Sequence, residues 1–391
     1  EKRDFAVVAS KKTDKFGILA AYEYSDNKSP WNTEIPVIAR GGDHTSVGGR
    51  DLRGTVCLDP VVRAVSALNR PTGTSFQSPG FAPAAARCGL LSQNNIIPDG
   101  KRHAALVTAE YQLNDTVRLW TEINYSMYKT VSLGGRQTLN FIIPSTNPYF
   151  RPVAAMGAGV TRQYITRSGL GLFPQTVSHQ YAELAGLTLG VDVDLGNDWK
   201  GVLTAHASRT RDFNESPELD LLNVQKAANG TTLATALNPY GQAADNNAAV
   251  LASINNGSSQ DNKTSQRLRE LQFKVDGPVM AIPGGDIRAA IGVDYRGDQA
   301  IQLQTAGSRA PGSSFYNVVR DDNINRSIAA LFTEVNVPLV GEGNARPGMQ
   351  ALTLALSGRY DYYDVYGGKF NPKLGVVYSP LEGLNIHGSY G

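Results

Sequence analysis

The chain of 391 residues has no hydrophobic run long enough to cross a membrane as a helix. Such a helix needs about 20 consecutive apolar residues, and no apolar stretch of even 18 residues occurs. The mean hydropathy is −0.26, and 18% of the residues are charged. The sequence therefore excludes a helical membrane protein, and its composition taken alone resembles that of a soluble one.

An excess of charge of one sign is also missing. The chain has 37 basic and 35 acidic residues, which gives a formal net charge of only +2, and the two signs are interspersed. Basic patches with interleaved aromatic residues are absent too. Since nucleic-acid binding depends on concentrated positive charge, we expect no nucleic-acid partner.

Residues that commonly carry catalysis are few and scattered. No two of the five histidines are one helical turn apart, and no Gly-x-Ser-x-Gly or Walker motif occurs. Acid and base pairs that would suit a glycosidase recur along nearly every extended segment, which favours a structural role for them. His206 and His387 fall among polar residues, where hydrated wall lining is the simpler interpretation. We therefore expect no enzyme, no metal site and no cofactor.

The feature that is present is strict alternation of apolar and polar residues. Between Tyr181 and Arg211 two alternating runs flank the short turn Leu195–Asp198. Successive side chains of a strand point to opposite faces, so each run has one apolar and one polar face. Across the two runs, the residues of the apolar face are Ala185, Leu187, Leu189, Val191 and Val193, followed by Trp199, Gly201, Leu203, Ala205 and Ala207.

Six such hairpins give about twelve antiparallel strands. Between them run five polar excursions, at 27–101, 129–180, 212–265, 302–326 and 363–371. Short turns on one side and long loops on the other are typical of a transmembrane β-barrel, whose strands leave only a weak hydropathy signal. The other five hairpins cover 5–24, 102–128, 267–295 around a turn at 277–286, 327–362 and 373–390.

The residues that alternate with the apolar ones in these strands are polar, and some of them are charged. A charge facing lipid near the midplane costs about 2–4 kcal/mol, so charged side chains are sorted toward the lumen. We therefore predict that these residues line the barrel interior. The predicted lumen-lining residues are Arg118, Glu122, Asp294, Arg296, Arg359 and Asp361.

The first long excursion contains both cysteines, Cys57 and Cys88. An even pair in a loop that faces an oxidising space predicts a disulfide worth about 3–4 kcal/mol, and two free thiols are the alternative. No Cys-x-x-Cys spacing supports a metal site. Helical patterns are scarce, and only Pro60–Asn69 and Pro217–Ala228 suggest short loop helices.

Several motifs occur in a specific order along the chain. Asn147-Pro148-Tyr149 is repeated as Asn238-Pro239-Tyr240-Gly241, and the turn Ile282-Pro283-Gly284-Gly285-Asp286 comes later. Three further extended segments follow, Phe332–Leu339, Gly358–Tyr363 and Asn371–Gly391. In this order the motifs resemble the extracellular motifs, a periplasmic turn and the strands after it in the barrel of TonB-dependent outer-membrane receptors, especially a proteobacterial subgroup.

This resemblance implies an all-β fold in which the chain supplies about half of a barrel. Barrels of this class have about 22 strands around a plugged lumen. Since neither a plug with its TonB-contacting segment nor a terminal aromatic strand is recognised, residues 1–391 are expected to be a partial barrel domain. An unclosed sheet is not tolerated in hydrocarbon, so the isolated segment should not insert stably.

The implied function is import of a scarce, large ligand across the outer membrane of a Gram-negative bacterium. The implied partners are outer-membrane lipid, the TonB complex acting through the plug, and a ligand such as a ferric siderophore, cobalamin or an oligosaccharide. A passive porin-like barrel and a secreted all-β polysaccharide-binding or lyase protein are the alternatives. Exposed loop aromatics stack on sugars and catechols, and the candidate ligand contacts are Trp31, Tyr149, Phe150, Tyr164 and Tyr240.

Overall fold

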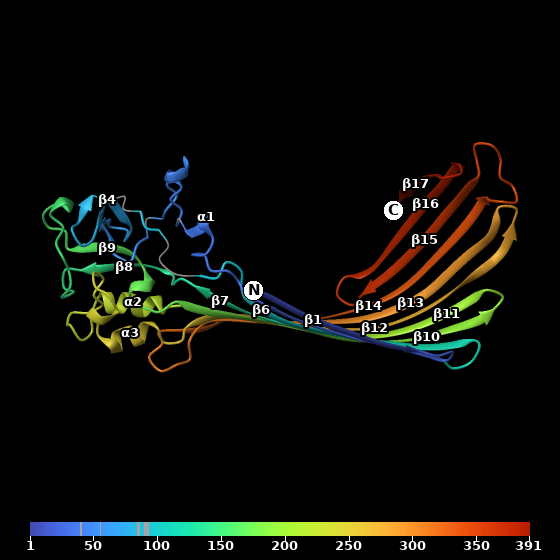
Figure 1. The fold of residues 1–391 in the computed structure, drawn as a ribbon, viewed down its shortest axis with the longest axis horizontal. Helices are drawn as coiled ribbons and strands as arrows, with labels where there is room; N and C mark the ends of the chain where they lie inside the picture. Colours follow the sequence, from blue (N-terminus) through green and yellow to red (C-terminus); the bar gives the residue numbers. More distant parts are fainter. Residues whose placement is uncertain (40, 55, 84–86, 90–93) are drawn as a thin grey trace.

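The computed structural model describes residues 1–391 except 40, 55, 84–86 and 90–93. Its described residues form two antiparallel sheets, one of twelve strands and one of five. The predicted all-β fold with about twelve barrel strands is thus confirmed. The large sheet is long and curved, and it carries the small sheet with three helices at one of its ends (Figure 1).

The strands of the large sheet follow the chain order, apart from the strands that belong to the small sheet. Each strand pairs antiparallel with the next, so the sheet is a series of hairpins. The sheet is open, with β1 and β17 as its edges. In spatial order the strands are β1 (Lys2–Lys12), β2 (Phe16–Asn27), β6 (Asp99–Gln112), β7 (Val117–Gly134), β10 (Thr176–Gly196), β11 (Trp199–Pro217), β12 (Ser259–Ile282), β13 (Gly285–Gly307), β14 (Tyr316–Val340), β15 (Ala351–Tyr363), β16 (Gly367–Leu381) and β17 (Leu384–Tyr390).

Three long connections of the large sheet fold together into a separate body, here called the cap (residues 28–98, 135–175 and 218–258). The cap contains the small sheet, in the order β5-β4-β3-β9-β8, and three helices. Its elements are β3 (Val61–Val65), β4 (Pro71–Gln77), β5 (Ala82–Pro83), β8 (Thr138–Pro144), β9 (Arg162–Ser168), α1 (Pro36–Ala39), α2 (Leu221–Ala228) and α3 (Ala248–Ile254).

The hydrophobic core of the described chain lies in the cap. Apolar residues of β3, β8 and β9 pack against α2 and α3, so three loops far apart in sequence share one core. In the large sheet, the only buried hydrophobic side chain among the described residues is Ala330. The core cluster comprises Val62, Leu139, Phe141, Ile143, Ile165, Leu172, Phe173, Leu219, Val224, Ala227, Ala228, Leu237, Tyr240, Val250 and Ile254.

The two helix expectations had different outcomes. The helix expected at Pro217–Ala228 forms as α2, where the Asp220 side chain caps the first turn by accepting a hydrogen bond from the Asn223 N–H at 3.0 Å. The prediction of a helix at Pro60–Asn69 is wrong. Its segment forms β3, which pairs with β4 and β9 and buries Val61 and Val62. β-Branched residues favour a strand once neighbouring strands are available.

Several strands extend beyond their predicted ends. The turn predicted at Gly277–Asp286 is wrong, because β12 and β13 pair up to Ile282 and Gly285 and leave a two-residue turn. A bulge between Pro278 and Met280 absorbs the proline, so the ladder continues. β14 begins at Tyr316 rather than at 327, since backbone pairing continues beyond the strictly alternating segment.

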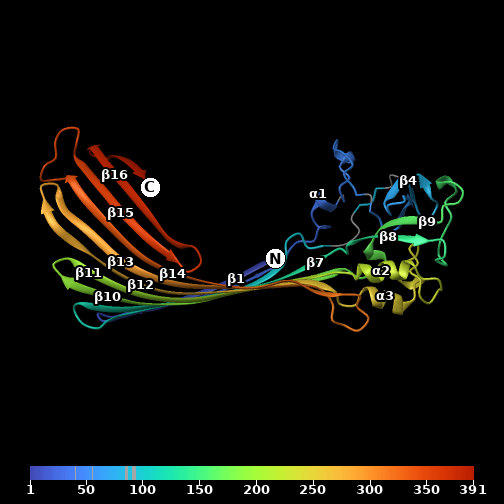
Figure 2. The same cartoon turned by 180° about the vertical axis from the view of Figure 1, so that it is seen from behind.

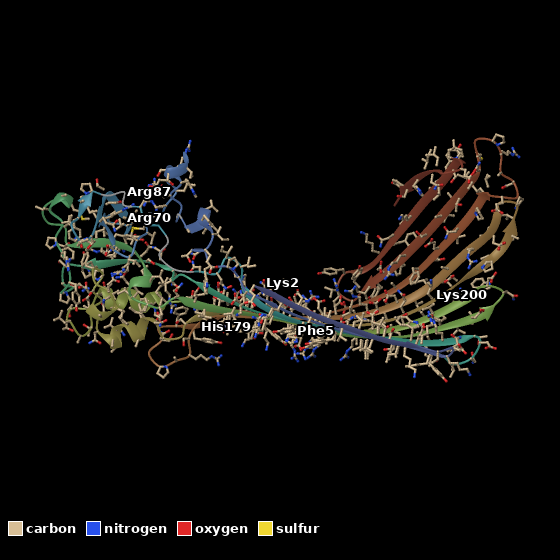
Figure 3. The ribbon with its side chains drawn as sticks, viewed as in Figure 1. Lys2, Phe5, Arg70, Arg87, His179 and Lys200 are labelled. Carbon is tan, nitrogen blue, oxygen red and sulfur yellow. A yellow bond between two sulfur atoms is a disulfide. The ribbon has the colours of Figure 1, made fainter. Side chains whose placement is uncertain are left out.

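The long loops and the short turns lie at opposite ends of the large sheet (Figures 1 and 2). In Figure 3, Arg70 and Arg87 lie in the cap and His179 lies on the cap side of the large sheet, whereas Lys200 lies near the short turns. The excursions predicted at 27–101, 129–180 and 212–265 thus lie on one side, as the spacing of the hairpins predicts. The long excursions predicted at 302–326 and 363–371 are wrong, because strand pairing continues through most of them and leaves connections of only 308–315 and 364–366.

No helix of the described residues has the length and apolar content that a membrane span requires.

Candidate functional site: the charged face and the cap

The register of the large sheet shows which side chains share a face. Directly paired residues of an antiparallel ladder project from the same face. One such row crosses five strands through Glu122, Thr188, His206, Glu270 and Arg296. Asp294 and Asp361 lie in the row two residues away from this one, and Arg118 and Arg359 lie in rows four residues away, so their side chains project from the same face. All six therefore lie on one face, here called the charged face; that it lines a lumen stays a prediction.

Arg118 joins two strands on the charged face. Its Nε donates to the Asp192 carboxylate at 3.0 Å, and its Nη1 donates to Glu110 at 3.1 Å. The Trp120 indole N–H also donates to Asp192, at 3.1 Å. Trp120 lies over Gly190, where an added Cβ would collide with the indole ring, so glycine is required there.

A second network centres on Arg359. Its guanidinium donates to Asp294 at 2.9 Å and to Asp361 at 2.7 Å, and Asn371 also donates to Asp361, at 3.3 Å. Asp361 is buried although it lies in the sheet. Nearby, Asp298 accepts hydrogen bonds from Arg296 at 2.9 Å and from Arg326 at 2.6 Å. Charges of both signs are thus paired across strands, which leaves a polar but nearly neutral surface.

The opposite face of the large sheet, here called the apolar face, exposes large hydrophobic side chains. Water would penalise such a surface, whereas lipid would not. Its exposed members include Leu187, Leu189, Leu203, Leu271, Phe273, Ile291, Val293, Tyr295, Leu331, Tyr360 and Tyr362.

A hollow of about 420 Å³ lies on the charged face near β1, β2, β6 and β7. Lys12, Glu110, Arg118, Trp120 and Glu122 are among its lining residues. Lys12 forms an ion pair with Glu110 at 3.3 Å. The hollow therefore combines paired charges with one indole ring. Arg118 and Glu122 were predicted from the sequence to line the lumen, whereas Lys12, Glu110 and Trp120 were not among the candidates.

The expected exposure of Tyr240 is wrong, because only 9% of this residue is exposed. Its hydroxyl donates to Gln163 at 2.6 Å, its ring meets Phe81 edge-on at 5.8 Å, and the Arg151 guanidinium lies 4.9 Å from the ring centre. The second Asn-Pro-Tyr motif thus brings its tyrosine into the shared core. Tyr240 holds the cap together and is not available to stack on a ligand.

The other four candidate aromatics are partly exposed. Phe150 packs against the edge of the core, and the backbone of Tyr149 donates to the Asn147 side chain at 2.8 Å. Tyr164 lies on β9, and Trp31 forms an isolated bridge with Asn95. The structure does not gather these four into one site, but all belong to the cap.

A buried arginine, Arg167, links two loops of the cap. Its Nη1 donates to the carbonyl oxygens of Pro239 and Gly241 at 2.7 and 2.8 Å. Burial lowers the pKa of Arg167 to about 10. A Cβ at Gly171 would collide with the guanidinium. No sequence pattern distinguishes this arginine from those of the sheet, because its role depends on contact between the second and third long loops.

Asp220 is a second buried link. Besides capping α2, its carboxylate accepts hydrogen bonds from the Ser314 N–H at 2.7 Å, from the Ser314 hydroxyl and from Asn256 at 2.9 Å. Burial by itself raises the pKa of Asp220, but the hydrogen bonds from Ser314, Asn223 and Asn256 outweigh it, so the pKa lies below its usual value. The carboxylate thereby ties the β13–β14 loop to the cap.

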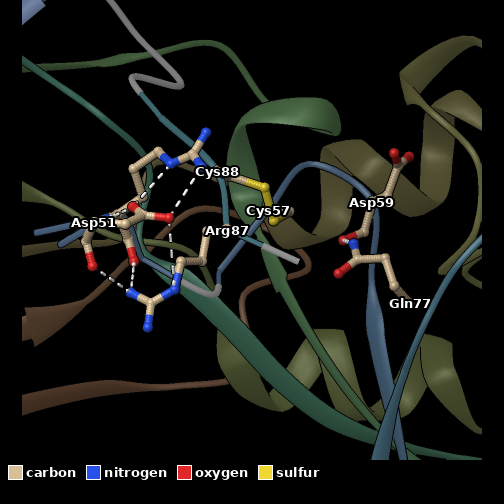
Figure 4. The surroundings of a disulfide bond; sticks show 7 residues. Asp51, Cys57, Asp59, Gln77, Arg87 and Cys88 are labelled. Atoms are coloured by element: carbon tan, nitrogen blue, oxygen red, sulfur yellow. Dashed lines mark hydrogen bonds and ion pairs between the residues drawn. A yellow bond between two sulfur atoms is a disulfide. The ribbon is translucent and has the colours of Figure 1, made fainter. Parts of the chain in front are cut away.

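Cys57 and Cys88 form a disulfide in the first loop (Figure 4). The carbonyl of Cys57 accepts a hydrogen bond from the Ser168 N–H at 2.8 Å, which ties the disulfide to the second loop. Beside it, Arg87 donates to the Asp51 carbonyl at 2.9 Å. A side-chain hydrogen bond from Arg53 lowers the pKa of Asp51 to about 2.

Within the described part of the chain, no group of three or more His, Cys, Asp or Glu residues is arranged to hold a metal ion.

Two solved structures are similar to this chain at low sequence identity. FpvA of Pseudomonas aeruginosa, bound to a pyoverdine, has a TM-score of 0.49 and 11% identity over 99% of this chain and 40% of its own. The outer-membrane transporter YddB of Escherichia coli has a TM-score of 0.47 and 10% identity over 96% of this chain and 36% of its own. The chain thus spans well under two thirds of these proteins. Among curated proteins no sequence matches it.

Comparison with family models gives a match over more than half of the chain. The TonB dependent receptor-like β-barrel model matches residues 111–391, which include part of β6 and every later strand of the large sheet. This chain therefore belongs to the TonB-dependent receptor β-barrel family.

Proposed function

We propose that the chain forms part of the wall and the outer cap of a receptor that imports a scarce, large ligand across the outer membrane of a Gram-negative bacterium. The observation that carries the proposal is a sheet with one apolar and one charged face and with its three longest connections, which form the cap, at one end. Family membership supports the same function. Energy for import would come from the TonB complex.

The two edges of the large sheet support a larger barrel. β1 and β17 each have one unpaired side, and unpaired backbone groups are not tolerated in hydrocarbon. Residues 1–391 would therefore be a partial barrel domain, whose edges pair with further strands of the same protein. A plug inside the closed barrel would contact the charged face and communicate with TonB.

Ligand capture would begin at the cap. Trp31, Tyr149, Phe150 and Tyr164 offer partly exposed aromatic surface, which suits a catechol, a sugar or a corrin ring. The paired charges of the charged face would keep the pathway below hydrated without holding an ion of either sign tightly. Ferric siderophores, cobalamin and oligosaccharides are the ligand classes that fit these surfaces.

The test is uptake by the full-length protein in cells that lack other receptors of this family. Radiolabelled ferric siderophores, cobalamin and oligosaccharides are offered with and without a functional TonB. We expect TonB-dependent uptake of one class, and at least a tenfold loss when Tyr149→Ala and Phe150→Ala are combined. Tyr366→Ala is the control, because Tyr366 is an exposed aromatic in the β15–β16 turn, outside the cap.

Two results would contradict parts of this proposal. If uptake of every ligand continues without TonB, the protein is a passive barrel and the receptor function is wrong. If the double alanine variant imports as well as the Tyr366→Ala control, Tyr149 and Phe150 are not ligand contacts, and Trp31 and Tyr164 become the next residues to replace.

A further inference from the structure

Four arginines interrupt the apolar face of the large sheet. Arg209 and Arg211 occupy alternate positions of β11, and Arg267 and Arg269 do so on β12. The register places Arg269 beside Ala207, in the row next to Leu271, so these arginines follow directly after the apolar residues. They do not belong to the charged face, where cations of the sheet meet anions across strands.

The arginines are opposed to each other rather than paired with carboxylates. Arg209 is the direct partner of Arg267 in the ladder, and like charges in this arrangement destabilise a sheet. Among the described residues, only Arg211 of the four has an ion pair, with Glu183 at 3.7 Å. Arg209 and Arg267 reach only neutral groups, Ser265 and Gln299, each at 3.4 Å. The cluster therefore has an excess of positive charge that the described chain does not neutralise.

The height of the cluster places it at one rim of the apolar face. From Met280 to Leu271 the strand rises roughly 30 Å, which is roughly 23 Å along a barrel axis for a strand tilted by about 40°. That height matches the apolar band of about 25 Å that such barrels present to lipid. Arg269 and Arg267 follow Leu271 toward the cap, so they lie where hydrocarbon gives way to lipid headgroups on the side of the long loops.

Hollows of two kinds meet at the cluster. A polar hollow of about 410 Å³ is lined by Arg267, Arg269, Gln299 and Asn325, and Gly297 leaves its floor open. Asp298 and Arg326 line it too, but they form an ion pair with each other at 2.6 Å. An apolar hollow of about 450 Å³ adjoins the same arginines and includes Ile123, Tyr125 and Leu187. Asp364 also lines the polar hollow, and its carboxylate accepts hydrogen bonds from the Ser327 N–H and hydroxyl at 2.9 and 3.0 Å. These neutral donors do not cancel its charge, so this one carboxylate offsets part of the positive charge of the arginines and leaves the rest.

We propose that Arg209, Arg267 and Arg269 bind the phosphorylated headgroup of an outer-leaflet lipid, whose acyl chains lie in the adjoining apolar hollow. Arginine presents a planar fork of donors that matches phosphate oxygens, and a doubly negative phosphate neutralises the opposed pair. Donors for the headgroup and apolar surface for the chains thus lie side by side on neighbouring strands, because Leu187 and Tyr125 share ladder rows with Arg269 and Arg267. This proposal rests on the membrane placement proposed above.

The test is lipid retention by the full-length protein, purified in detergent and measured by native mass spectrometry. The probes are bis-phosphorylated lipid A and the same lipid after removal of both phosphates. We expect wild-type protein to retain the phosphorylated probe, and the triple variant Arg209→Gln/Arg267→Gln/Arg269→Gln to bind it at least tenfold more weakly. The dephosphorylated probe should not distinguish the two proteins.

The matched control is Lys101→Gln/Lys129→Gln/Lys263→Gln. These lysines project from the same face of the sheet, in a row nearer the cap, so the control removes equal charge outside the cluster. Retention that is unchanged in the arginine variant, lost equally in the control, or equal for both probes would each overturn the proposal.

Protein stability separates a lost site from a lost fold. Without phosphorylated lipid, the arginine variant should melt at the same or a higher temperature than wild type, because it removes repulsion. Adding the phosphorylated probe should raise the melting temperature of wild type alone. If the triple variant does not fold, Arg267→Gln alone removes the opposed pair and should weaken retention, and retention at the wild-type level would overturn the proposal.

Uptake is measured separately, so a receptor that retains lipid but imports nothing contradicts only the proposed function.

Discussion

The cap and the large sheet use their hydrophobic residues in opposite ways. The cap buries Leu139, Ile143 and Ile165 completely, as a water-soluble domain does. The large sheet leaves Phe273 and Leu331 about half exposed on one face and places its charges on the other. One chain thus contains a region organised for water and a region organised for lipid.

This difference shows that the two regions are stabilised by different surroundings. The cap has its own core, so water supplies its hydrophobic driving force. The large sheet has backbone ladders but almost no core of its own, so under the proposed function we expect its stability to depend on lipid and on closure of a barrel. Substitutions that affect one region should therefore leave the other nearly unchanged, and the following predictions test that separation.

The largest effect is expected from emptying the cap core with Phe141→Ala. Phe141 is 2% exposed, and such a truncation typically costs about 3–5 kcal/mol of unfolding free energy. The cap should become sensitive to trypsin, while the barrel of the full-length protein keeps its heat-modifiable mobility on gels. Leu222→Ala is the control, because this leucine of α2 is 61% exposed. Loss of both regions together would show that they are not independent.

Removal of the disulfide should have the next largest effect. Cys57 and Cys88 are 31 positions apart, so the double Cys→Ser variant should lower the stability of the cap by about 3–4 kcal/mol in the loop-closure estimate. Urea unfolding of the cap, followed by trypsin cleavage, measures this loss. Reductant should reproduce the loss in wild type and have no effect on the variant. A cap equally stable in both proteins would refute the estimate.

A charge on the apolar face tests the role of lipid. Phe273→Arg should cost about 2–4 kcal/mol of unfolding free energy in lipid vesicles. Gln272→Arg on the adjacent position is the matched control, since the register places it on the charged face. Both are measured in the full-length protein by urea titration. Equal costs at the two positions would mean that the apolar face does not contact lipid.

The smallest effect is expected at Asp220, where Asp220→Asn should cost the cap about 1–3 kcal/mol by placing an amide against the donors of Asn223, Asn256 and Ser314. The pKa of Asp220 is lowered from its usual 3.8 in the folded cap. Its carboxylate therefore contributes stability above pH 3.8, and that contribution is lost as the pH falls through the lower folded value.

Acid titration of cap unfolding checks this pH dependence. The decrease in cap stability below pH 4 should be smaller in Asp220→Asn than in wild type. Asp245→Asn is a control at an exposed carboxylate of the third loop. If the variant and wild type lose stability in parallel, Asp220 is not the group that makes the cap acid-sensitive.

The large sheet was predicted well because the alternation of apolar and polar residues, on which the prediction rests, is a property of each strand by itself. Alternation at Leu187, Leu189 and Val191 depends only on which face of one strand meets lipid, and every hairpin repeats it. The same logic sorted Arg118 and Arg359 onto one face. Strand ends were less well predicted, since β-pairing continues where alternation stops.

The cap could not be predicted in the same way. Val62, Phe141 and Val224 come from three loops, and no pattern within one loop shows that its apolar residues pack against those of the other two. Pro60–Asn69 looked helical and became a strand because β4 and β9 were available to pair with it. Tyr240 looked like an exposed loop aromatic but is part of the core, because its hydroxyl bonds Gln163 and its ring packs on Phe81, both from other loops.

The sequence by itself determined the family, the twelve strands and the two faces of the large sheet, because a strand in a membrane is patterned residue by residue by its surroundings. Only the tertiary structure decided that three polar loops share a core, that Arg167 and Asp220 link them, and that Arg209 opposes Arg267. These features depend on contacts between segments distant in sequence, and no local pattern encodes such contacts.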